Sequence, residues 1–314
     1  MLPDRANVTV WEPTGSNAGC YLRELMEMRL TTLRWRLTAF AGSAILACAI
    51  GARLLGYREA LAQTSTAPGA SAVPEASADP EDSPVVLELF TSEGCSSCPP
   101  ADELLSKIGA SSTGVIPLAY HVDYWDGLGW SDPLSSGQWT ARQTVYVRAM
   151  KLSGPYTPQI VINGRRQCVG SDPGGIARAI AAARTTPAPG LVTLRMTTPA
   201  AGAHKLNVSV RARVVRTAGD KPLIVLLAIY ENGLLAKIEA GENNGHQVTY
   251  DYTVRKIVPV FELGATQGSS LENEISVELD PSWKLEHLGV AAFIQDESSL
   301  AIDGAAAQYP IVKN

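Results

Sequence analysis

The sequence predicts an α/β domain with the element order β-α-β-α-β-β-α, followed by an antiparallel β-sandwich domain. Three observations support this prediction. Between residues 85 and 187, short apolar runs alternate with amphipathic helical patterns. From residue 188 to residue 314, short segments that tend to alternate apolar and polar side chains are separated by turn sequences. A cysteine pair, Cys95 and Cys98, lies between the first predicted strand and the first predicted helix.

Residues 1–62 are expected to lie outside the folded part of the protein. Arginines precede the almost wholly apolar run 37–52, and the small residues at 60–62 fit a cleavage site, as is typical of a secretory signal peptide. We interpret 1–62 as an upstream extension and a signal peptide that begins at Met26 or Met28. An uncleaved N-terminal membrane anchor is the alternative. The protein is therefore expected to be exported, periplasmic or secreted, and to contact a membrane only if this segment is retained.

Residues 63–84 are predicted to form a flexible linker. They are rich in alanine, serine and proline and contain almost no large apolar side chains, so they cannot bury enough surface to become ordered. The cysteines that follow the linker are Cys95, Cys98 and Cys168. In an exported protein these cysteines meet an oxidising compartment, where a pair can persist as a disulfide.

The first strand and the first helix flank the cysteine pair. The apolar run 85–90 predicts a buried strand, and Pro99 favours the start of a helix that continues to Ile108. Asp102 lies in its first turn, where a carboxylate suits the positive end of the helix dipole. Because proline disfavours helical geometry in the residue that precedes it, we expect the helix to begin after Cys98.

The other elements of the first domain follow from the same patterns. An Asn-Gly turn, which is a strong hairpin signal, joins the third and fourth strands. Asp172 is suited to cap the last helix. These elements are a strand at 115–122, a helix at 135–152, strands at 159–164 and 165–170, and a helix at 173–184.

The second domain is predicted to consist of strands and to carry no chemistry of its own. It contains no cysteine, and its histidines have no metal-ligand spacing. The polar loop 241–247 is long enough to reach the first domain. The predicted strands are 191–198, 205–215, 223–230, 248–254, 274–280, 288–296 and 301–309.

The composition argues against nucleic acid as a partner. The chain has a formal net charge of −5 and a sequence pI of about 5.5, and no basic stripe occurs along it.

A C-x-x-C pair next to a βαβ pattern is the arrangement of a thioredoxin fold. The motifs ELFTSEGCSSCPPAD, HVDYWDGLGWSDP, YTPQIVING and GENNGHQVTYDYTVR together resemble the secreted, thioredoxin-like family called domain of unknown function 1223. The resemblance covers residue 85 to the C-terminus. It implies a fold and an export route, and it implies no reaction.

The cysteine pair is the main candidate site. A cysteine at a helix N-terminus has a lowered pKa, so Cys95 is suited to attack a disulfide and Cys98 to resolve the mixed disulfide. Glu93 is close enough to repel a Cys95 thiolate. By resemblance, Pro158 is a cis proline beside the pair, and Thr157-Pro158 shapes a groove for an extended substrate.

Four further residues are candidates with two interpretations each. His121, at the end of the second strand, either tunes the thiolate or is structural. Glu88, in the first strand, either is buried and accepts a proton from Cys98 or points to solvent. Trp125 either lines a substrate groove or packs a loop. Cys168 is either a small buried residue or a redox relay or metal ligand.

Three functions compete. The leading hypothesis is an exported thiol-disulfide oxidoreductase that needs no cofactor and acts on a disulfide or thiol substrate protein or a small thiol. The second is a Cu(I)-binding or copper-delivery protein that uses Cys95, Cys98 and His121, because soft thiolates select Cu(I). The third is a binding protein in which the disulfide only braces the fold.

Overall fold

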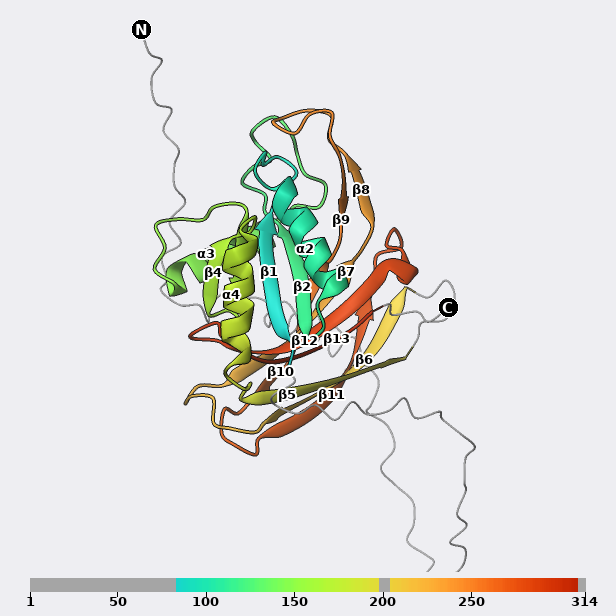
Figure 1. Cartoon of the computed structure of the whole chain (residues 1–314). Coiled ribbons are helices and arrows are strands. Elements are labelled where there is room, and N and C mark those ends of the chain that lie inside the picture. The colour runs from blue at the N-terminus through green and yellow to red at the C-terminus, as the bar shows by residue number, and fades with distance from the viewer. Residues whose placement is uncertain (1–82, 198–203, 310–314) are drawn as a thin grey trace, which may run out of the picture. The chain divides into compact units, whose positions relative to one another are not determined.

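The structure, a computed structural model, describes residues 83–197 and 204–309. It is a mixed α/β protein with a large central sheet and few helices (Figure 1). The predicted signal peptide and nearly all of the predicted linker lie outside the described ranges. Within these ranges, no helix has the length and apolar character that a membrane span requires.

The observed elements follow the predicted order through the first half of the chain. They are β1 (Val85–Thr91), α2 (Pro99–Ser111), β2 (Val115–His121), α3 (Gly137–Ala149), β3 (Gln159–Ile162), β4 (Arg166–Val169), α4 (Pro173–Arg184), β5 (Gly190–Thr197), β6 (Lys205–Val214), β7 (Leu223–Glu231), β8 (Leu234–Lys237), β9 (Gln247–Tyr250), β10 (Thr253–Leu263), β11 (Ser270–Glu278), η2 (Leu285–His287), β12 (Leu288–Asp296) and β13 (Ile302–Gln308).

One eight-stranded sheet contains strands from both halves of the chain. Its order is β13-β12-β7-β10-β2-β1-β3-β4, in which β1 is parallel to β2 and antiparallel to β3. The halves meet where β10 pairs in parallel with β2: Thr253 lies beside Ala119, whose amide donates to the carbonyl of Tyr252 at 2.8 Å. The predicted boundary near residue 187 therefore does not separate two sheets.

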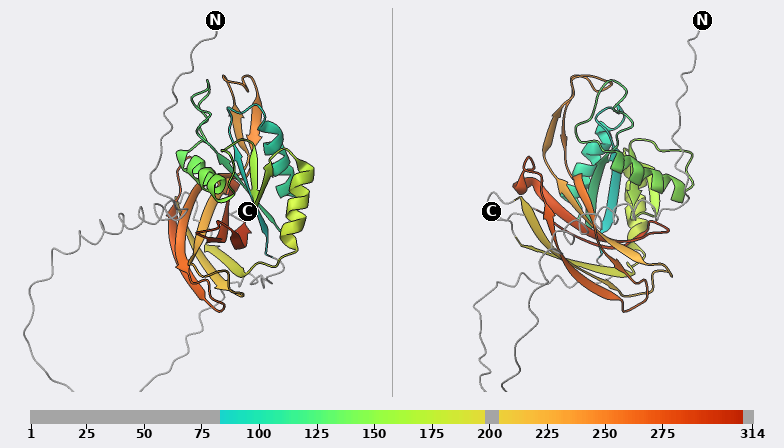
Figure 2. Two further views of the ribbon diagram at one scale, coloured as in Figure 1. Left: turned by 90° about the vertical axis from the view of Figure 1, so that its left-hand side faces the viewer. Right: turned by 180° about the vertical axis from the view of Figure 1, so that it is seen from behind.

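Different elements cover the two faces of this sheet. Helix α3 packs on one face and α2 and α4 on the other, as the left view of Figure 2 shows. A second sheet, ordered β11-β6-β5, packs against the β7, β10 and β12 part of the large sheet. Both faces of β7 and β12 are consequently covered, which explains why both are continuous apolar runs buried along their whole length.

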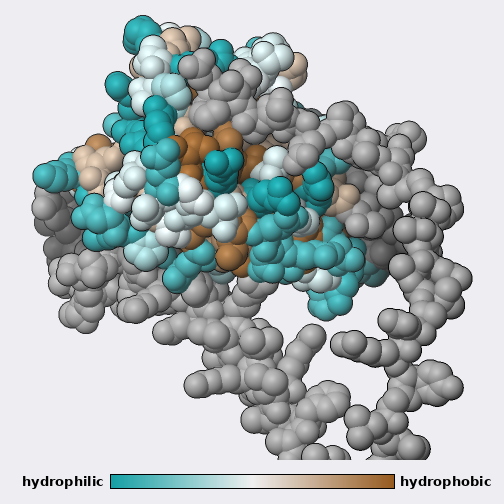
Figure 3. Space-filling view, turned by 90° about the horizontal axis from the view of Figure 1, so that it is seen from below, coloured by the Kyte–Doolittle hydropathy of each residue, from teal (hydrophilic) through white to brown (hydrophobic). Residues whose placement is uncertain are grey.

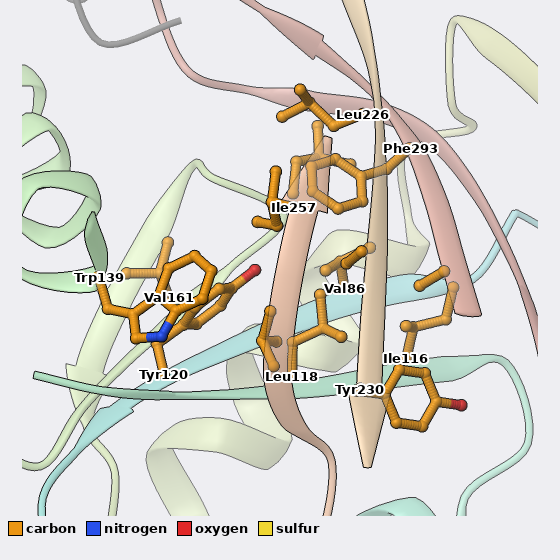
Figure 4. Packing of buried hydrophobic residues seen from close by; sticks show 14 of the residues in the cluster. Val86, Ile116, Leu118, Tyr120, Trp139, Val161, Leu226, Tyr230, Ile257 and Phe293 are labelled. Atoms are coloured by element: carbon orange, nitrogen blue, oxygen red, sulfur yellow. The ribbon is translucent and has the colours of Figure 1, made fainter. Parts of the chain in front are cut away.

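The core on the α3 face contains residues from both halves of the chain. Figure 4 shows Tyr120 and Trp139 from the first half in one cluster with Leu226, Ile257 and Phe293 from the second. Side chains next to these along β7 point to the opposite face and pack against the second sheet. Burial of this shared cluster stabilises the two halves as one structure, at about 25 cal/mol per Å² of apolar surface removed from water.

The outer face of the second sheet is polar. Along β6, buried and more exposed residues alternate, and the outward residues include Lys205 and Arg211. Arg211 forms an ion pair with Glu272 of β11 at 2.5 Å. Seen from below, this side of the molecule is largely hydrophilic where it is coloured, with smaller hydrophobic areas between (Figure 3). The alternation of apolar and polar residues that predicted strands here therefore reflects a sheet with one covered face and one solvated face.

The prediction of a single strand at 248–254 is wrong. Strand β9 ends at Tyr250 and β10 begins at Thr253. Tyr252 between them has a positive φ of 56°, which breaks the extended backbone. Strand β8 and the extension of β10 to Leu263 were not predicted.

A buried ion pair joins α3 to β1. The Arg142 Nε lies 2.7 Å from an oxygen of Glu88, and both side chains are almost fully buried. Tyr146 donates its hydroxyl proton to the other Glu88 oxygen, and Arg142 also donates to Gln295 of β12 at 3.3 Å. The pair therefore links a helix and two distant strands of the large sheet.

We expect Arg142→Met to lower the free energy of unfolding by about 3–5 kcal/mol, because it leaves the Glu88 charge buried without its cation. The double variant Glu88→Leu/Arg142→Met should lose much less, since neither buried charge remains. Urea unfolding measures both. Arg148→Met, at an exposed position of the same helix, is the control and should change stability by no more than about 0.5 kcal/mol. Equal losses in the single and double variants would contradict the expectation.

Candidate functional site

Cys95 and Cys98 form a disulfide in the turn between β1 and α2. The two sulfur atoms are 2.16 Å apart, and both side chains are 0% exposed. The Cys95 amide donates to the carbonyl of Ser92 at 3.2 Å, and the Cys98 amide donates to the carbonyl of Cys95 at 3.1 Å. These consecutive turns lead into α2, which begins at Pro99, after both cysteines, as predicted. Cys98 itself nevertheless has helical backbone angles, φ −82° and ψ −37°, because the preceding turn already carries the chain into the helix.

The N-terminus of α2 offers no free backbone donor to a sulfur anion. Its first two residues are prolines, which have no N–H. The amides of the next two residues, Ala101 and Asp102, both donate to the carbonyl of Cys98, at 2.8 and 3.1 Å. The backbone of this helix end therefore leaves only the effect of its dipole to stabilise a thiolate. A side-chain donor is nevertheless present, since the Ser97 hydroxyl lies 3.4 Å from the Cys95 sulfur.

Thr157, Pro158 and Trp125 lie at the cysteine turn. The Thr157–Pro158 peptide bond is cis, as the resemblance implied, and immediately precedes β3. Ser97 donates its hydroxyl proton to the carbonyl of Thr157 at 3.5 Å, and the indole N–H of Trp125 donates to the Thr157 hydroxyl at 2.8 Å. Trp125 also contacts the turn from its other side, since a Cβ added to Gly94 would lie 3.1 Å from the Trp125 Cβ.

Four buried titratable side chains lie beside the cysteine turn, and we name them the acidic cluster: Glu93, Asp102, His121 and Asp132. His121 Nδ1 lies 2.7 Å from Asp132 Oδ2, which also accepts the Glu93 amide at 2.9 Å. The indole N–H of Trp130 donates to the Glu93 carboxylate at 2.7 Å. The cluster thus ties the end of β2 to the backbone directly before the disulfide.

Mutual charge and burial set the protonation of this cluster. Burial disfavours the charge on His121, but Asp132, Asp102 and Glu93 outweigh it and raise the pKa of His121. Burial also disfavours the charge on Asp132, but His121 outweighs it and lowers the pKa of Asp132. Burial, helped by the Asp132 charge, raises the pKa of Glu93. His121 and Asp132 are therefore favoured as an imidazolium–carboxylate pair.

Asp102 is the member of the cluster whose carboxyl group is least engaged. Neither of its oxygens has a hydrogen-bond partner of good geometry among the described residues, although the Thr91 hydroxyl is close enough to lower its pKa, and His121 Nε2 has no partner among them. Burial raises the pKa of Asp102 to about 7, against the opposing charge of His121. The position of Asp102 in the first helical turn was predicted, but its burial beside His121 was not.

Glu88 is buried, but the structure separates it from the cysteine pair. Its side chain lies on the α3 face of β1 and pairs with Arg142. Its neighbours Leu87 and Leu89 face α2 instead, as the strand alternation requires. The expected transfer of a proton from Cys98 to Glu88 therefore has no geometric support. The buried carboxyls on the cysteine side are those of the acidic cluster, and Asp102 is the one on the same helix as Cys98.

A hairpin from the second half of the chain covers the disulfide. We call residues 234–250, which comprise β8, β9 and their connecting loop, the hairpin arm. Figures 1 and 2 show its tip next to the loop that precedes α2. Asn243 in the loop is 2% exposed, and its amide nitrogen donates to the carbonyls of Glu93 and Cys95, at 2.8 and 2.9 Å. Glu242 accepts the amide of Ser96 at 3.2 Å. The predicted reach of the 241–247 loop to the cysteine site is thereby confirmed.

Cys168 remains a free, partly buried thiol on β4. Its backbone lies beside Ile160 of β3, and burial raises the pKa of its thiol. These features agree with the interpretation as a small packed residue.

The residues of the copper hypothesis are engaged elsewhere in this state. Both cysteines are in the disulfide, and His121 Nδ1 contacts Asp132. In residues 83–197 and 204–309, no three His, Cys, Asp or Glu side chains are grouped in a way that could hold a metal ion.

Residues 86–295 match the model of a family described as "Protein of unknown function (DUF1223)". A crystal structure of a protein from Agrobacterium tumefaciens, determined as a structural genomics target, is 30% identical, with a TM-score of 0.55; the match covers 71% of this chain and 92% of that one. HBP35 of Porphyromonas gingivalis is 20% identical with a TM-score of 0.55, over 72% of this chain and 74% of that one, which is a likeness of fold alone. No curated protein matches the chain.

We expect Asn243→Ala to lower the free energy of unfolding by about 1–3 kcal/mol, because two buried carbonyls lose their donor. If a reductant reaches the disulfide only when the hairpin arm opens, reduction should accelerate about tenfold for each 1.4 kcal/mol lost. The unfolding of the oxidised protein and its reduction by a dithiol measure the two effects. Asn244→Ala, at the exposed neighbouring position, is the control. An unchanged reduction rate in a destabilised Asn243 variant would show that the arm does not limit access.

The stability of the oxidised protein should fall as the pH rises from about 4 to about 7. The folded state holds the Asp102 proton up to about pH 7, whereas the unfolded chain releases it near the ordinary value of 3.8, so the advantage of the folded state is lost across this window. The raised pKa of His121 acts in the same direction, but only above the ordinary histidine pKa of 6.5. We therefore expect Asp102→Asn to be more stable relative to wild type at pH 8 than at pH 5, by on the order of a few kcal/mol. Urea unfolding at both pH values tests this, and a pH-independent difference would contradict it.

Proposed function

The chain belongs to the DUF1223 family of proteins of unknown function, and from this premise we propose that its own site makes it an exported thiol-disulfide oxidoreductase. Cys95 is the sulfur that a substrate thiol attacks, or that attacks a substrate disulfide. Cys98 is its resolving partner, and Pro158 shapes the groove in which the substrate docks. The observation that carries the proposal is a C-x-x-C disulfide next to a cis proline and a buried acidic cluster.

The arrangement of the first half of the chain supports a thioredoxin-like unit at residues 85–187. Its elements follow the order β-α-β-α-β-β-α, and the disulfide lies between the first strand and the first helix. Strands β2, β1, β3 and β4 are neighbours in this order in the sheet. The cis peptide bond directly precedes β3.

The surroundings of the disulfide support chemistry more than bracing. Carboxyl and imidazole groups are costly to bury, and structural networks usually satisfy all their hydrogen bonds. Here, among the described residues, the Asp102 oxygens have no hydrogen bond of good geometry, with only the Thr91 hydroxyl nearby, and the Nε2 atom of His121 has no partner. Buried groups with perturbed pKa values beside a redox-capable pair are characteristic of functional sites.

The proposed activity includes movement of the hairpin arm. Both cysteine side chains are fully buried, so a substrate thiol reaches the sulfur atoms only after a neighbouring segment moves, and the arm is bonded to the carbonyl of Cys95 through Asn243. The arm is held at this point by side-chain bonds from a loop, which open at lower free energy than a strand of the core sheet. The substrates we propose are disulfide-containing or thiol proteins, or small thiols, met after export.

We expect native wild-type protein to gain two trappable thiols when a dithiol is added, and to reduce or form disulfides in a model peptide repeatedly. Cys95→Ser should lose this turnover. Cys98→Ser should instead accumulate a mixed disulfide with the peptide, because no second thiol resolves it. Mass spectrometry of acid-quenched, alkylated protein measures both outcomes.

Cys168→Ser is the matched control and should retain turnover. If dithiol opens the wild-type disulfide only under conditions that unfold the protein, the disulfide is a brace and the proposal fails. A copper titration of the reduced protein separates the metal-binding hypothesis, since tight binding that requires Cys95 and His121 would favour it.

A further inference from the structure

We propose, on the basis of the oxidoreductase function above, that Asp102 delivers a proton to Cys98 when the disulfide opens and takes it back when the disulfide closes. Asp102 lies one helical turn from Cys98 and is buried with it. Its carboxyl oxygens have no hydrogen-bond partner of good geometry among the described residues, and the nearby Thr91 hydroxyl is the one side-chain donor that lowers its pKa.

The helix places the two side chains on the same face. Cys98 has helical backbone angles, and the amide of Asp102 donates to the carbonyl of Cys98 at 3.1 Å, which is the i to i+4 bond of the first helical turn. Side chains at this spacing lie one above the other, with Cβ atoms about 5–6 Å apart. Glu103, the next residue, points to solvent and pairs with Lys107 at 2.6 Å. Of the Asp102 and Glu103 carboxyl groups, only that of Asp102 is therefore directed to the cysteine side.

A thiolate released at Cys98 lacks the free backbone donors that would stabilise its charge. Thiolates at helix N-termini are ordinarily stabilised by free amides. Here the two leading prolines have none, and the next two amides already bond to the Cys98 carbonyl. The backbone amide of Cys98 itself donates a hydrogen bond to the carbonyl of Cys95. Cys98 is fully buried and Asp102 lies one helical turn away, so this acid can neutralise the sulfur as the disulfide bond breaks.

The acidic cluster equips Asp102 to give and regain this proton. Burial keeps Asp102 protonated up to about pH 7, so the donor form is present near neutrality. After the transfer, the His121 charge stabilises the Asp102 carboxylate, while Asp132 and Glu93 oppose it. Tyr250 of the hairpin arm also faces this group, and burial, followed by the charges of the acidic neighbours, raises the pKa of its hydroxyl. Among the described residues that shift the pKa of Asp102, His121 is the cationic one.

With a dithiol substrate, the exchange begins when one thiolate of the substrate attacks the Cys95 sulfur. The Cys95–Cys98 bond breaks, and the electron pair of that bond stays on the Cys98 sulfur. The Asp102 carboxyl protonates that sulfur and becomes a carboxylate. The second substrate thiol then loses its proton, attacks the mixed disulfide and releases Cys95. The substrate is oxidised to a disulfide, the protein pair is reduced by two electrons, and the two substrate protons restore Asp102 and protonate Cys95.

The test is the pH profile of reduction of the oxidised full-length protein by dithiothreitol. Rates are divided by the concentration of dithiothreitol thiolate and measured from about pH 5 to about pH 9. For wild type we expect the normalised rate to fall as the pH passes about 7, where Asp102 loses its proton. Asp102→Asn should be slower at low pH on the order of tenfold and should lack this fall. The factor lies below usual general-acid contributions because a thiolate is already a good leaving group.

Glu103→Gln is the matched control on the same helix and should reproduce the wild-type profile. A profile of Asp102→Asn that matches wild type overturns the proposal. If this variant does not fold, the wild-type profile is a sufficient test, because a normalised rate that does not change across the pH range also overturns the proposal. Failure of the oxidoreductase function is distinguishable, since dithiothreitol would then not reduce the native wild-type disulfide at any pH.

Discussion

The parallel pairing of β10 with β2 joins the hairpin arm to the half of the chain that carries the disulfide. It is short: Thr253 lies beside Ala119, and one backbone hydrogen bond of 2.8 Å joins Ala119 to Tyr252. Through it, two segments more than a hundred residues apart become neighbours in one sheet. The hairpin arm leaves the sheet from β7 and returns at β10, so its loop is carried to the turn that begins α2. Gly109 permits this approach, because a Cβ there would lie 2.4 Å from the Tyr252 ring.

Much of the fold could be predicted from local patterns, but the joining of its halves could not. The strand, turn and helix signals of residues 85–187 match the observed elements closely, because each depends on short-range periodicity and capping. The continuous apolar runs of β7 and β12 are a local signal of strands that are covered on both faces. Which strand lies beside which is a long-range property, and nothing near Ala119 or Thr253 in the sequence records their pairing. The positive φ of Tyr252 likewise has no local signal in a run rich in strand-forming residues.

The candidate site shows the same division. Cys95, Cys98, Thr157, Pro158, Trp125 and His121 were predicted from motifs, and the structure brings them together. Glu88 was predicted as a proton acceptor for Cys98, and Asp102 only as a residue of the first helical turn. Strand alternation directs Glu88 to Arg142, whereas the helix turns Asp102 inward. Asn243 and Asp132 were not singled out, because their importance depends on backbone groups that only the folded chain brings within reach. A polar run next to tryptophans, such as 123–132, was the available signal for Asp132.

The attachment of the hairpin arm has an evolutionary consequence. The arm is an excursion between two adjacent antiparallel strands, and its own two-stranded sheet is separate from the large one. Its length and loop sequence can therefore diverge while β7 and β10 keep their register. Relatives that share the cysteine turn can in this way acquire different covers over the same sulfur atoms, and each cover would admit a different set of molecules. Selectivity in such a lineage would reside in an insertion, and the scaffold beneath it would stay constant.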